Sequence, residues 1–381
     1  MRTGRTWLAY GALASYAYCL YGLGPVLAFL HADLHLSYTV TNIHSTLWAA
    51  GTVVTGVSYP PLARRFGRRR VFWSAVAAFA AGTALFIAGY HLAVTLLAAA
   101  VLGTAGTTVL TGTTGMLADE HGQLRDRALI EANVGASATA VLAPVVIGGL
   151  ASTAAGWRAG MAVPVVAFAA LWLRFRHLPL SGAGGPAGQV RSGRLPGACW
   201  VALGLVAVVV GIEFCVVFDA ALLLHAHAGL STRHAAAYLS VFFAGELAGR
   251  LGGSRLARAA GRERLILGAA LAVTAAGFAV FWSARQPGFA VAGLAVAGVG
   301  VANLYPFSLA LAMAAAPGRT DQAAGRSQLA VGAAVLSAPF ALGALADRIG
   351  VVRAYLIEPG LIAAAAALVF AAQAAARASA S

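Results

Sequence analysis

The sequence predicts an all-α polytopic membrane protein in which twelve transmembrane helices form two six-helix bundles. Composition is the first reason: 60% of the 381 residues are hydrophobic and only 10% are charged, with a mean hydropathy of +0.81. A soluble domain carries about 25% charged residues. The second reason is that the apolar residues gather in long segments, and the third is that the two halves of the chain repeat the same landmarks.

Each half contains six apolar segments long enough to cross a bilayer. In the first half, the predicted spans are 6–30, 38–62, 71–91, 93–117, 128–153 and 158–175. In the second half, they are 198–224, 234–256, 265–284, 288–315, 328–346 and 352–375. Residues 177–197 are rich in Gly and Pro and are predicted to form a flexible cytoplasmic linker. The predicted bundles are therefore residues 1–176 and 198–381.

The repeat is clearest in two arginine-rich turns. The segment 59–70, YPPLARRFGRRR, returns as GSRLARAAGRER at 253–264, an offset of 194 residues. His31-Ala32 returns as His225-Ala226 with the same offset, and Ala143-Pro144 returns as Ala338-Pro339 with an offset of 195. Because the order and spacing agree in both halves, we interpret the chain as a tandem duplication of a six-helix unit.

The basic residues indicate how the chain is oriented. All 26 are arginines, the net charge is +14, and they fall mainly in short turns between the spans. A cytoplasmic N-terminus leaves five arginines outside, namely Arg158, Arg233, Arg285, Arg348 and Arg353. This agrees with the excess of positive charge expected on the cytoplasmic side, where arginines also meet anionic lipid. We therefore expect a multi-pass protein of the cell (inner) membrane with both termini cytoplasmic, and no nucleic-acid partner.

Several classes of protein are disfavoured by what the sequence lacks. It has no GxxxxGK[ST] phosphate-binding loop, which argues against an ATP-driven pump. Cys19, Cys199 and Cys215 lie in or at the edge of apolar segments without metal-ligand spacing, so they are predicted to be packing residues. We predict no metal site, no cofactor and no catalytic site.

Acidic residues inside the predicted spans mark a candidate site for proton or cation coupling. Glu213 and Glu246 each lie 12 residues from a histidine that marks the outer end of the span. That places both about 18 Å deep in an apolar core about 30 Å thick, where an ionised carboxylate is costly. Arg250, one turn after Glu246, favours an ion pair there, so Glu213 is the preferred coupling residue. Asp219 is nearer the outer end and is predicted to be an entrance residue.

Other polar residues inside the spans mark a candidate substrate cavity. Thr104, Thr107, Thr108 and Thr111 have the spacing of one helix face. The alternative for these threonines is that their hydroxyl groups bond to carbonyl groups of their own helix. The alternative for Asn303 is that its amide bonds to a neighbouring helix, and the alternative for His44 is that it is a packing residue. The candidate cavity residues are Tyr16, His44, Thr104, Thr107, Thr108, Thr111, Asn303 and Tyr305.

Three features of the sequence resemble the major facilitator superfamily. They are the two six-helix halves, the basic turn after the second and eighth spans, and Gly156-Trp157-Arg158 before the sixth span. The resemblance implies two bundles around a central cavity lined by the first, fourth, seventh and tenth helices, with alternating access. The family's turn motif is Gly-x-x-x-Asp-Arg-x-Gly-Arg-Arg, and Arg64 occupies its acidic position here. The matching residues are Arg65, Gly67, Arg68 and Arg69, and the second copy contains Arg258, at the acidic position, with Gly261 and Arg262.

Two further features have open interpretations. Ala143-Pro144 and Gly148-Gly149 in the fifth span are similar to the Gly-Pro and Gly-Gly motif of antiporters in that family, but they are also typical of a kinked, closely packed helix. Glu131 and Arg326 occupy equivalent positions in the two halves, 195 residues apart. Either they pair in a cytoplasmic gate or both are solvated residues at helix ends, and the sequence leaves both interpretations open.

The resemblance and the residues together predict a secondary active transporter rather than an enzyme. We expect a monomer that exports a small amphipathic organic molecule in exchange for protons. An uptake symporter for a small metabolite is the alternative within the same class. An intramembrane enzyme is disfavoured because no cluster of nucleophile, base or metal ligands is present, and a non-transporting sensor or scaffold because buried carboxylates are costly to keep without a function.

Overall fold

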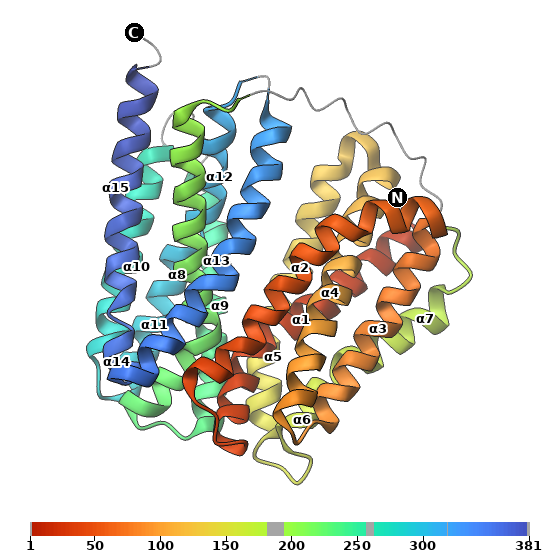
Figure 1. Cartoon of the computed structure of the whole chain (residues 1–381), viewed down its shortest axis with the longest axis horizontal. Helices are drawn as coiled ribbons and strands as arrows, with labels where there is room; N and C mark the ends of the chain where they lie inside the picture. Colours follow the sequence, from red (N-terminus) through yellow and green to blue (C-terminus); the bar gives the residue numbers. More distant parts are fainter. Residues whose placement is uncertain (1, 181–193, 257–262, 318, 379–381) are drawn as a thin grey trace. The chain divides into compact units, whose positions relative to one another are not determined.

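The computed structural model describes residues 2–180, 194–256, 263–317 and 319–378, and the regular structure of these residues is helical (Figure 1). The chain folds into two compact units. The first contains residues 1–36, 40–185 and 232–240, and the second contains residues 37–39, 186–231 and 241–381. Most of the predicted linker, residues 181–193, lies outside the described residues.

The helices follow the predicted spans. The first six spans correspond to α1 (Gly4–Asp33), α2 (Tyr38–Phe66), α3 (Arg68–Ala88), α4 (Leu92–His121), α5 (Arg125–Leu150) and the pair α6 (Gly156–Met161) and α7 (Val163–Phe175). The last six correspond to α8 (Gly197–Ala228), α9 (Thr232–Leu256), α10 (Glu263–Ser283), the pair α11 (Pro287–Val301) and α12 (Leu304–Ala314), α13 (Thr320–Ile349), and the pair α14 (Val351–Ala354) and α15 (Ile357–Ala378). The predicted all-α class is confirmed.

Ten helical segments of the described chain are long and apolar enough to cross a membrane. The other two predicted spans, the second and the eighth, are the helices α2 and α9, which contain 29 and 25 residues. Both have the length of a span but a lower hydropathy. In α2 the reason is a set of buried polar residues that includes Asn42, His44 and Thr55. The second helix of each half is therefore more polar than the spans around it.

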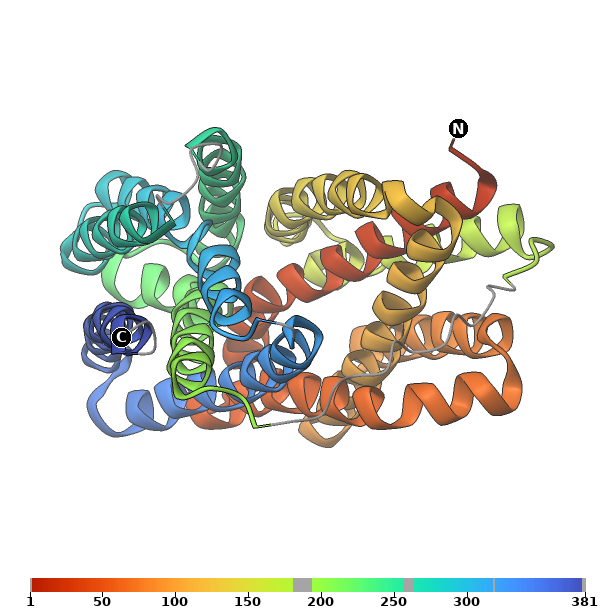
Figure 2. The ribbon, with the colours of Figure 1, turned by 90° about the horizontal axis from the view of Figure 1, so that it is seen from above.

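The first helix of each half is the centre of its unit. α1 packs against α4, α5 and α7, and α8 packs against α12, α13 and α15. Figure 2 shows α15, which ends at the C-terminus, beside α8. The apolar composition of α1 and α8 explains this position, since a helix that is hydrophobic on all sides is favoured where other helices surround it.

The close approach of two helices is repeated in the two units. In the first unit, a Cβ atom on Gly103 of α4 would lie 2.2 Å from the carbonyl oxygen of Trp48 in α2. In the second, a Cβ atom on Gly298 of α11 would lie 2.2 Å from the carbonyl oxygen of Phe242 in α9. Gly103 and Gly298 are 195 residues apart, and Trp48 and Phe242 are 194 apart. The duplication thus preserves a crossing that only glycine permits.

Candidate functional site

Two carboxyl groups and one guanidinium group meet inside the second unit. The Arg250 side chain binds Glu246 one turn earlier in α9, with an N–O distance of 3.1 Å. Arg250 also acts on Glu213 of α8, and Glu213 and Glu246 act on each other. Glu246 is 3% exposed and Glu213 is 9% exposed. The structure therefore joins the predicted coupling residue and the predicted ion pair into one cluster.

The charges of this cluster do not balance when both carboxyl groups are ionised. In the described chain, the charged groups that act on Glu213 are Glu246 and Arg250, so the three groups would together carry one negative charge. Binding one proton makes the cluster neutral. Because an unbalanced charge is costly in a buried site, the arrangement suits a site that gains and loses a proton.

Tyr305 of α12 borders this cluster. Its hydroxyl oxygen accepts a hydrogen bond of 3.3 Å from the Gln328 side chain of α13, and its side chain lies near enough to Glu213 to interact with it electrostatically. This residue was predicted to line the cavity. The structure places it beside the candidate coupling residue within the same unit.

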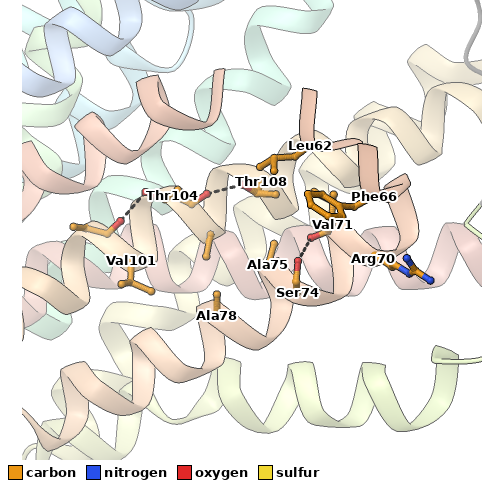
Figure 3. A pocket seen from close by; sticks show the side chains of 12 residues that line it. Leu62, Phe66, Arg70, Val71, Ser74, Ala75, Ala78, Val101, Thr104 and Thr108 are labelled. Atoms are coloured by element: carbon orange, nitrogen blue, oxygen red, sulfur yellow. Dashed lines mark hydrogen bonds between the residues drawn. The ribbon is translucent and has the colours of Figure 1, made fainter. Parts of the chain in front are cut away.

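The first unit contains a cavity of about 780 Å³ between α2, α3 and α4. Figure 3 shows Leu62 and Phe66 of α2 on one side of it, with Arg70 at one end. Thr104 and Thr108 of α4 supply hydroxyl groups to its otherwise largely apolar wall. A cavity with an apolar wall, a few hydroxyl groups and one cation suits an amphipathic organic molecule.

The second unit has a smaller cavity, of about 400 Å³, between α9, α10 and α11. Its lining includes Val299, Gly300 and Asn303, the repeat equivalents of Thr104, Ala105 and Thr108 in the first cavity. The Asn303 amide also donates a hydrogen bond of 2.9 Å to the carbonyl oxygen of Gly249 in α9. The Asn303 side chain thus lines this cavity and also bonds to a neighbouring helix, which are the two alternatives that the sequence left open.

The threonine face of α4 contacts α2. Thr104, Thr108 and Thr111 each donate a hydrogen bond to the carbonyl oxygen four residues earlier, the local bonding that the sequence left open as an alternative. The Thr107 hydroxyl lies 2.9 Å from that of Thr52, and the Thr108 hydroxyl lies 3.3 Å from that of Thr55. Much of the hydrogen-bonding capacity of this face is therefore used within the unit.

Tyr16 and His44 are both buried in the first unit. The Tyr16 ring packs against Trp48 and Phe79, with centroid separations of 6.3 and 6.5 Å. The two ring nitrogens of His44 lie 3.0 Å from the carbonyl oxygen of Thr41 and 2.9 Å from the Thr95 hydroxyl. These contacts explain both side chains as parts of the core.

Glu131 is bound within the first unit. Its carboxylate accepts a hydrogen bond of 2.8 Å from the Tyr10 hydroxyl and pairs with Arg2 at 3.1 Å and with Arg127 at 3.3 Å. Arg326 belongs to the second unit, on α13. The gate between Glu131 and Arg326 stays a prediction.

The first arginine-rich turn joins α2 to α3. Gly67 has φ = 82° and ψ = 144°, a conformation that glycine adopts without strain. Arg68 forms an ion pair with Asp119 at the end of α4, and the Arg69 side chain donates to the carbonyl oxygen of Arg176. The Arg65 guanidinium group lies 5.3 Å from the centre of the Phe66 ring. In the second turn, Arg258, Gly261 and Arg262 lie outside the described residues.

One buried acidic residue, Glu358, is not among the residues that the sequence pattern singled out. It is 0% exposed and lies in the first turn of α15. The signal was present, since it is an acidic residue inside the predicted span 352–375. Its neighbour Asp219 of α8 is 139 residues away in sequence, and the packing of α15 on α8 brings the two together.

A helical membrane protein of two units, with a buried cluster of two carboxyl groups and one guanidinium group and with cavities of ligand size, has the features of a membrane transporter. The family model of the Major Facilitator Superfamily matches residues 9–334. The chain belongs to the major facilitator superfamily. Members of this family are transporters, so the chain is a secondary transporter of the membrane and not an enzyme. No curated protein matches it by sequence.

Solved structures of transporters share the fold. A bacterial homologue of the human lysosomal transporter Spinster, inward-facing and occupied, is 13% identical with a TM-score of 0.79, covering 98% of both chains. A peptide transporter, POT, in complex with sulfate, is 14% identical with a TM-score of 0.78, covering 98% of this chain and 95% of that one. The nucleoside transporter NupG is 13% identical with a TM-score of 0.72, covering 97% and 98%. Identities this low indicate a shared fold only.

Proposed function

We propose that this transporter exports a small amphipathic organic molecule from the cytoplasm in exchange for protons, across the cell membrane and with both chain termini in the cytoplasm. The observation that carries the proton coupling is the cluster of Glu213, Glu246 and Arg250, in which two buried carboxyl groups share one guanidinium group. Its neutral state holds one proton. Loss of that proton leaves a negative charge that favours a different arrangement of helices or contact with water.

The cavity in the first unit supports the choice of substrate. Its wall combines apolar side chains with the hydroxyl groups of Thr104 and Thr108, and Arg70 adds a positive charge at one end. The volume of about 780 Å³ lies in the range of sites that bind drug-sized molecules. Export rather than uptake is supported by the likeness of Ala143-Pro144 and Gly148-Gly149 to the antiporter motif.

The substitution Glu213→Gln tests the proposal, because it keeps the shape of the side chain and removes the titratable group. A fluorescence binding screen of small amphipathic compounds on the purified protein first supplies a ligand. Everted vesicles with a pH difference of one unit then measure its accumulation. One coupled proton supports at most about tenfold accumulation, equivalent to about 1.4 kcal/mol. We expect the wild type to accumulate the ligand and Glu213→Gln to lose accumulation while it still binds.

Glu120→Gln is the matched control. The Glu120 carboxylate pairs with Arg5 at 3.0 Å in the first unit, whereas the cluster belongs to the second unit. This variant should accumulate the ligand as the wild type does. Unchanged accumulation by Glu213→Gln, with the wild-type dependence on pH, would remove Glu213 from the mechanism. Accumulation only in right-side-out vesicles would indicate an uptake symporter, and binding without flux a sensor.

A further inference from the structure

A second group of titratable side chains lies in the second unit, on a different side of α8. Glu213 and Asp219 are six residues apart in this helix, so they point about 120° apart around its axis. Glu213 belongs to the cluster with α9, whereas Asp219 interacts with Cys215 of the same helix and with Glu358 of α15. The proposed transport mechanism uses none of these last three residues.

Glu358 is buried without a counter-charge. It is 0% exposed, and neither of its carboxyl oxygens has a donor in hydrogen-bond geometry. The groups that act on it in the described structure are the Cys215 thiol, which lies beside it, and the Asp219 carboxyl. The first adds at most a weak hydrogen bond and the second adds negative charge. An ionised Glu358 would thus be both unsolvated and repelled.

The Tyr355 hydroxyl group interacts electrostatically with Glu358 but donates no hydrogen bond to it. The Tyr355 hydroxyl donates its proton to the carbonyl oxygen of Cys215, with an oxygen–oxygen distance of 3.0 Å. The Tyr355 ring is fully buried against Phe278 and Phe281 of α10, which makes that side of the site apolar. Tyr38, which groups with the second unit, interacts with Asp219. Among the described residues, the elements around Glu358 therefore supply no positive charge to it.

One effect favours the ionised form, and it is small. Glu358 lies in the first turn of α15, where the helix dipole stabilises a negative charge weakly. Burial of an unpaired carboxylate costs considerably more than the helix dipole contributes. The balance keeps a proton on Glu358 for as long as α15 is packed on α8.

We propose that Glu358 and Asp219 form a second proton-binding site, separate from the cluster of Glu213, Glu246 and Arg250. The bound proton resides on a Glu358 oxygen and neutralises the carboxyl group at the contact between α8 and α15. Its release leaves two adjacent carboxylates in an apolar contact, which weakens the packing of α15. This site does not depend on the substrate or on the direction of transport.

Thermal unfolding of the purified full-length protein in detergent, from about pH 6 to about pH 9, tests the site without a substrate. A group that folding keeps protonated contributes stability that is lost as the pH rises, because the unfolded chain releases that proton sooner. We expect the unfolding midpoint of the wild type to fall with rising pH and Glu358→Gln to remove at least half of that fall. Asp219→Asn removes the neighbouring negative charge, so it should change the pH at which the fall occurs.

Two controls separate this site from others. Glu213→Gln neutralises the other cluster. Its unfolding midpoint should still fall with rising pH by the amount that Glu358→Gln removes from the wild-type fall. Glu120→Gln, at a carboxylate paired with Arg5, should reproduce the wild-type profile. Superimposable profiles of wild type and Glu358→Gln would overturn the proposal. So would recovery of the midpoint at high pH by Na⁺, with choline at equal ionic strength as reference, since that would show a cation site.

The direction of the change in Asp219→Asn follows from the charge that it removes. Without the Asp219 carboxylate, Glu358 is repelled less when it ionises, so it releases its proton at a lower pH than in the wild type. The fall in the midpoint begins where the unfolded chain loses its proton, which the substitution does not change, so in Asp219→Asn it should end at lower pH and be smaller. A profile for Asp219→Asn identical to that of the wild type would remove Asp219 from the site.

Infrared spectroscopy gives a measurement that does not need the Glu358 variant to fold. A protonated carboxyl group absorbs apart from an ionised one, so the wild type at neutral pH should show a protonated band that declines as the pH rises. The Asp219→Asn variant should lose that band at lower pH. A wild-type spectrum without any protonated carboxyl band at neutral pH would exclude the site.

Discussion

Arg250 supplies positive charge to two buried carboxyl groups at once, and this determines how its removal would change the stability of the protein. It forms an ion pair with Glu246, and Glu213 lies within its field. Removing one partner from such a group leaves an uncompensated charge, which costs more than the pair contributes. The energetic role of Arg250 therefore depends on the protonation of its two neighbours.

Arg250→Met should destabilise the protein by about 1–3 kcal/mol, because the carboxylates lose a charged hydrogen-bond donor. The loss should be larger at high pH, where the carboxyl groups have fewer protons. Combining it with Glu246→Gln should recover part of the stability, since the repulsion between the acidic groups is relieved. Denaturant unfolding in detergent measures the two single variants and the double variant.

Arg127→Met is the matched control for this substitution. Arg127 pairs with Glu131 at 3.3 Å, but its side chain is 78% exposed, so its removal should change stability by less than about 0.5 kcal/mol. Equal losses for Arg127→Met and Arg250→Met would show that burial of the cluster does not determine its energetics.

For single residues, the sequence predicts the position along a helix but not the side chains that the residue meets on neighbouring helices. The depth of Glu213 and Glu246 followed from residue counts, and the structure places the two side chains within interaction range. The electrostatic interaction of Arg250 with Glu213, and that of Glu358 with Asp219, depend on how one helix packs on another. Hydropathy and spacing within one helix carry no information about such pairs. The surroundings of Glu131, Tyr16 and His44 depend on neighbouring helices in the same way.

At the scale of helices, the glycines at the crossing points explain how each unit holds together. Gly103 and Gly298 allow backbones to touch where a side chain would overlap a carbonyl oxygen. Gly51 and Gly245, again repeat equivalents, make similar close contacts from the opposing helices α2 and α9. In membranes, such contacts replace the hydrophobic effect as a source of helix association.

Gly103→Ala should therefore destabilise the first unit by about 1–3 kcal/mol, the usual cost of overpacking a well-packed contact. Gly298→Ala should have a comparable effect on the second. Thermal unfolding in detergent compares both with Gly56→Ala, a change in α2 at a position with no atom within 4 Å of the added Cβ. That control should be neutral or slightly stabilising. A Gly103→Ala protein as stable as Gly56→Ala would contradict the crossing geometry.

The helical segments themselves were largely predictable. The apolar runs, together with the repeat of the two halves, located all twelve segments, and each predicted span corresponds to a helix or a pair of helices. The short breaks at Ala162, between α11 and α12, and between α14 and α15 were not predicted. Such interruptions do not alter hydropathy, so a pattern of apolar residues cannot reveal them.

At the scale of the whole molecule, the duplication extends from the sequence into the packing. The central positions of α1 and α8, the glycine crossings and the two cavities all recur at offsets of 194 or 195 residues. The acidic residues do not recur: the positions in α1 equivalent to Glu213 and Asp219 are Cys19 and Pro25. We therefore expect proton binding to be a property of the second half, and the larger ligand cavity a property of the first.

The orientation of the chain in the membrane gives the last prediction. With a cytoplasmic N-terminus, 21 of the 26 arginines lie on or near the cytoplasmic side and five lie outside. In a background with Cys19, Cys199 and Cys215 replaced by alanine, a cysteine at Gln286, the residue before α11, should react with an impermeant thiol reagent in intact cells. A cysteine at Ser192, in the linker, should react only after the cells are permeabilised. Thr153→Cys, in the exposed turn after α5, is a second external position and should behave like Gln286→Cys. Labelling of Ser192→Cys in intact cells, with both external positions protected, would reverse the orientation and with it the direction of proposed transport.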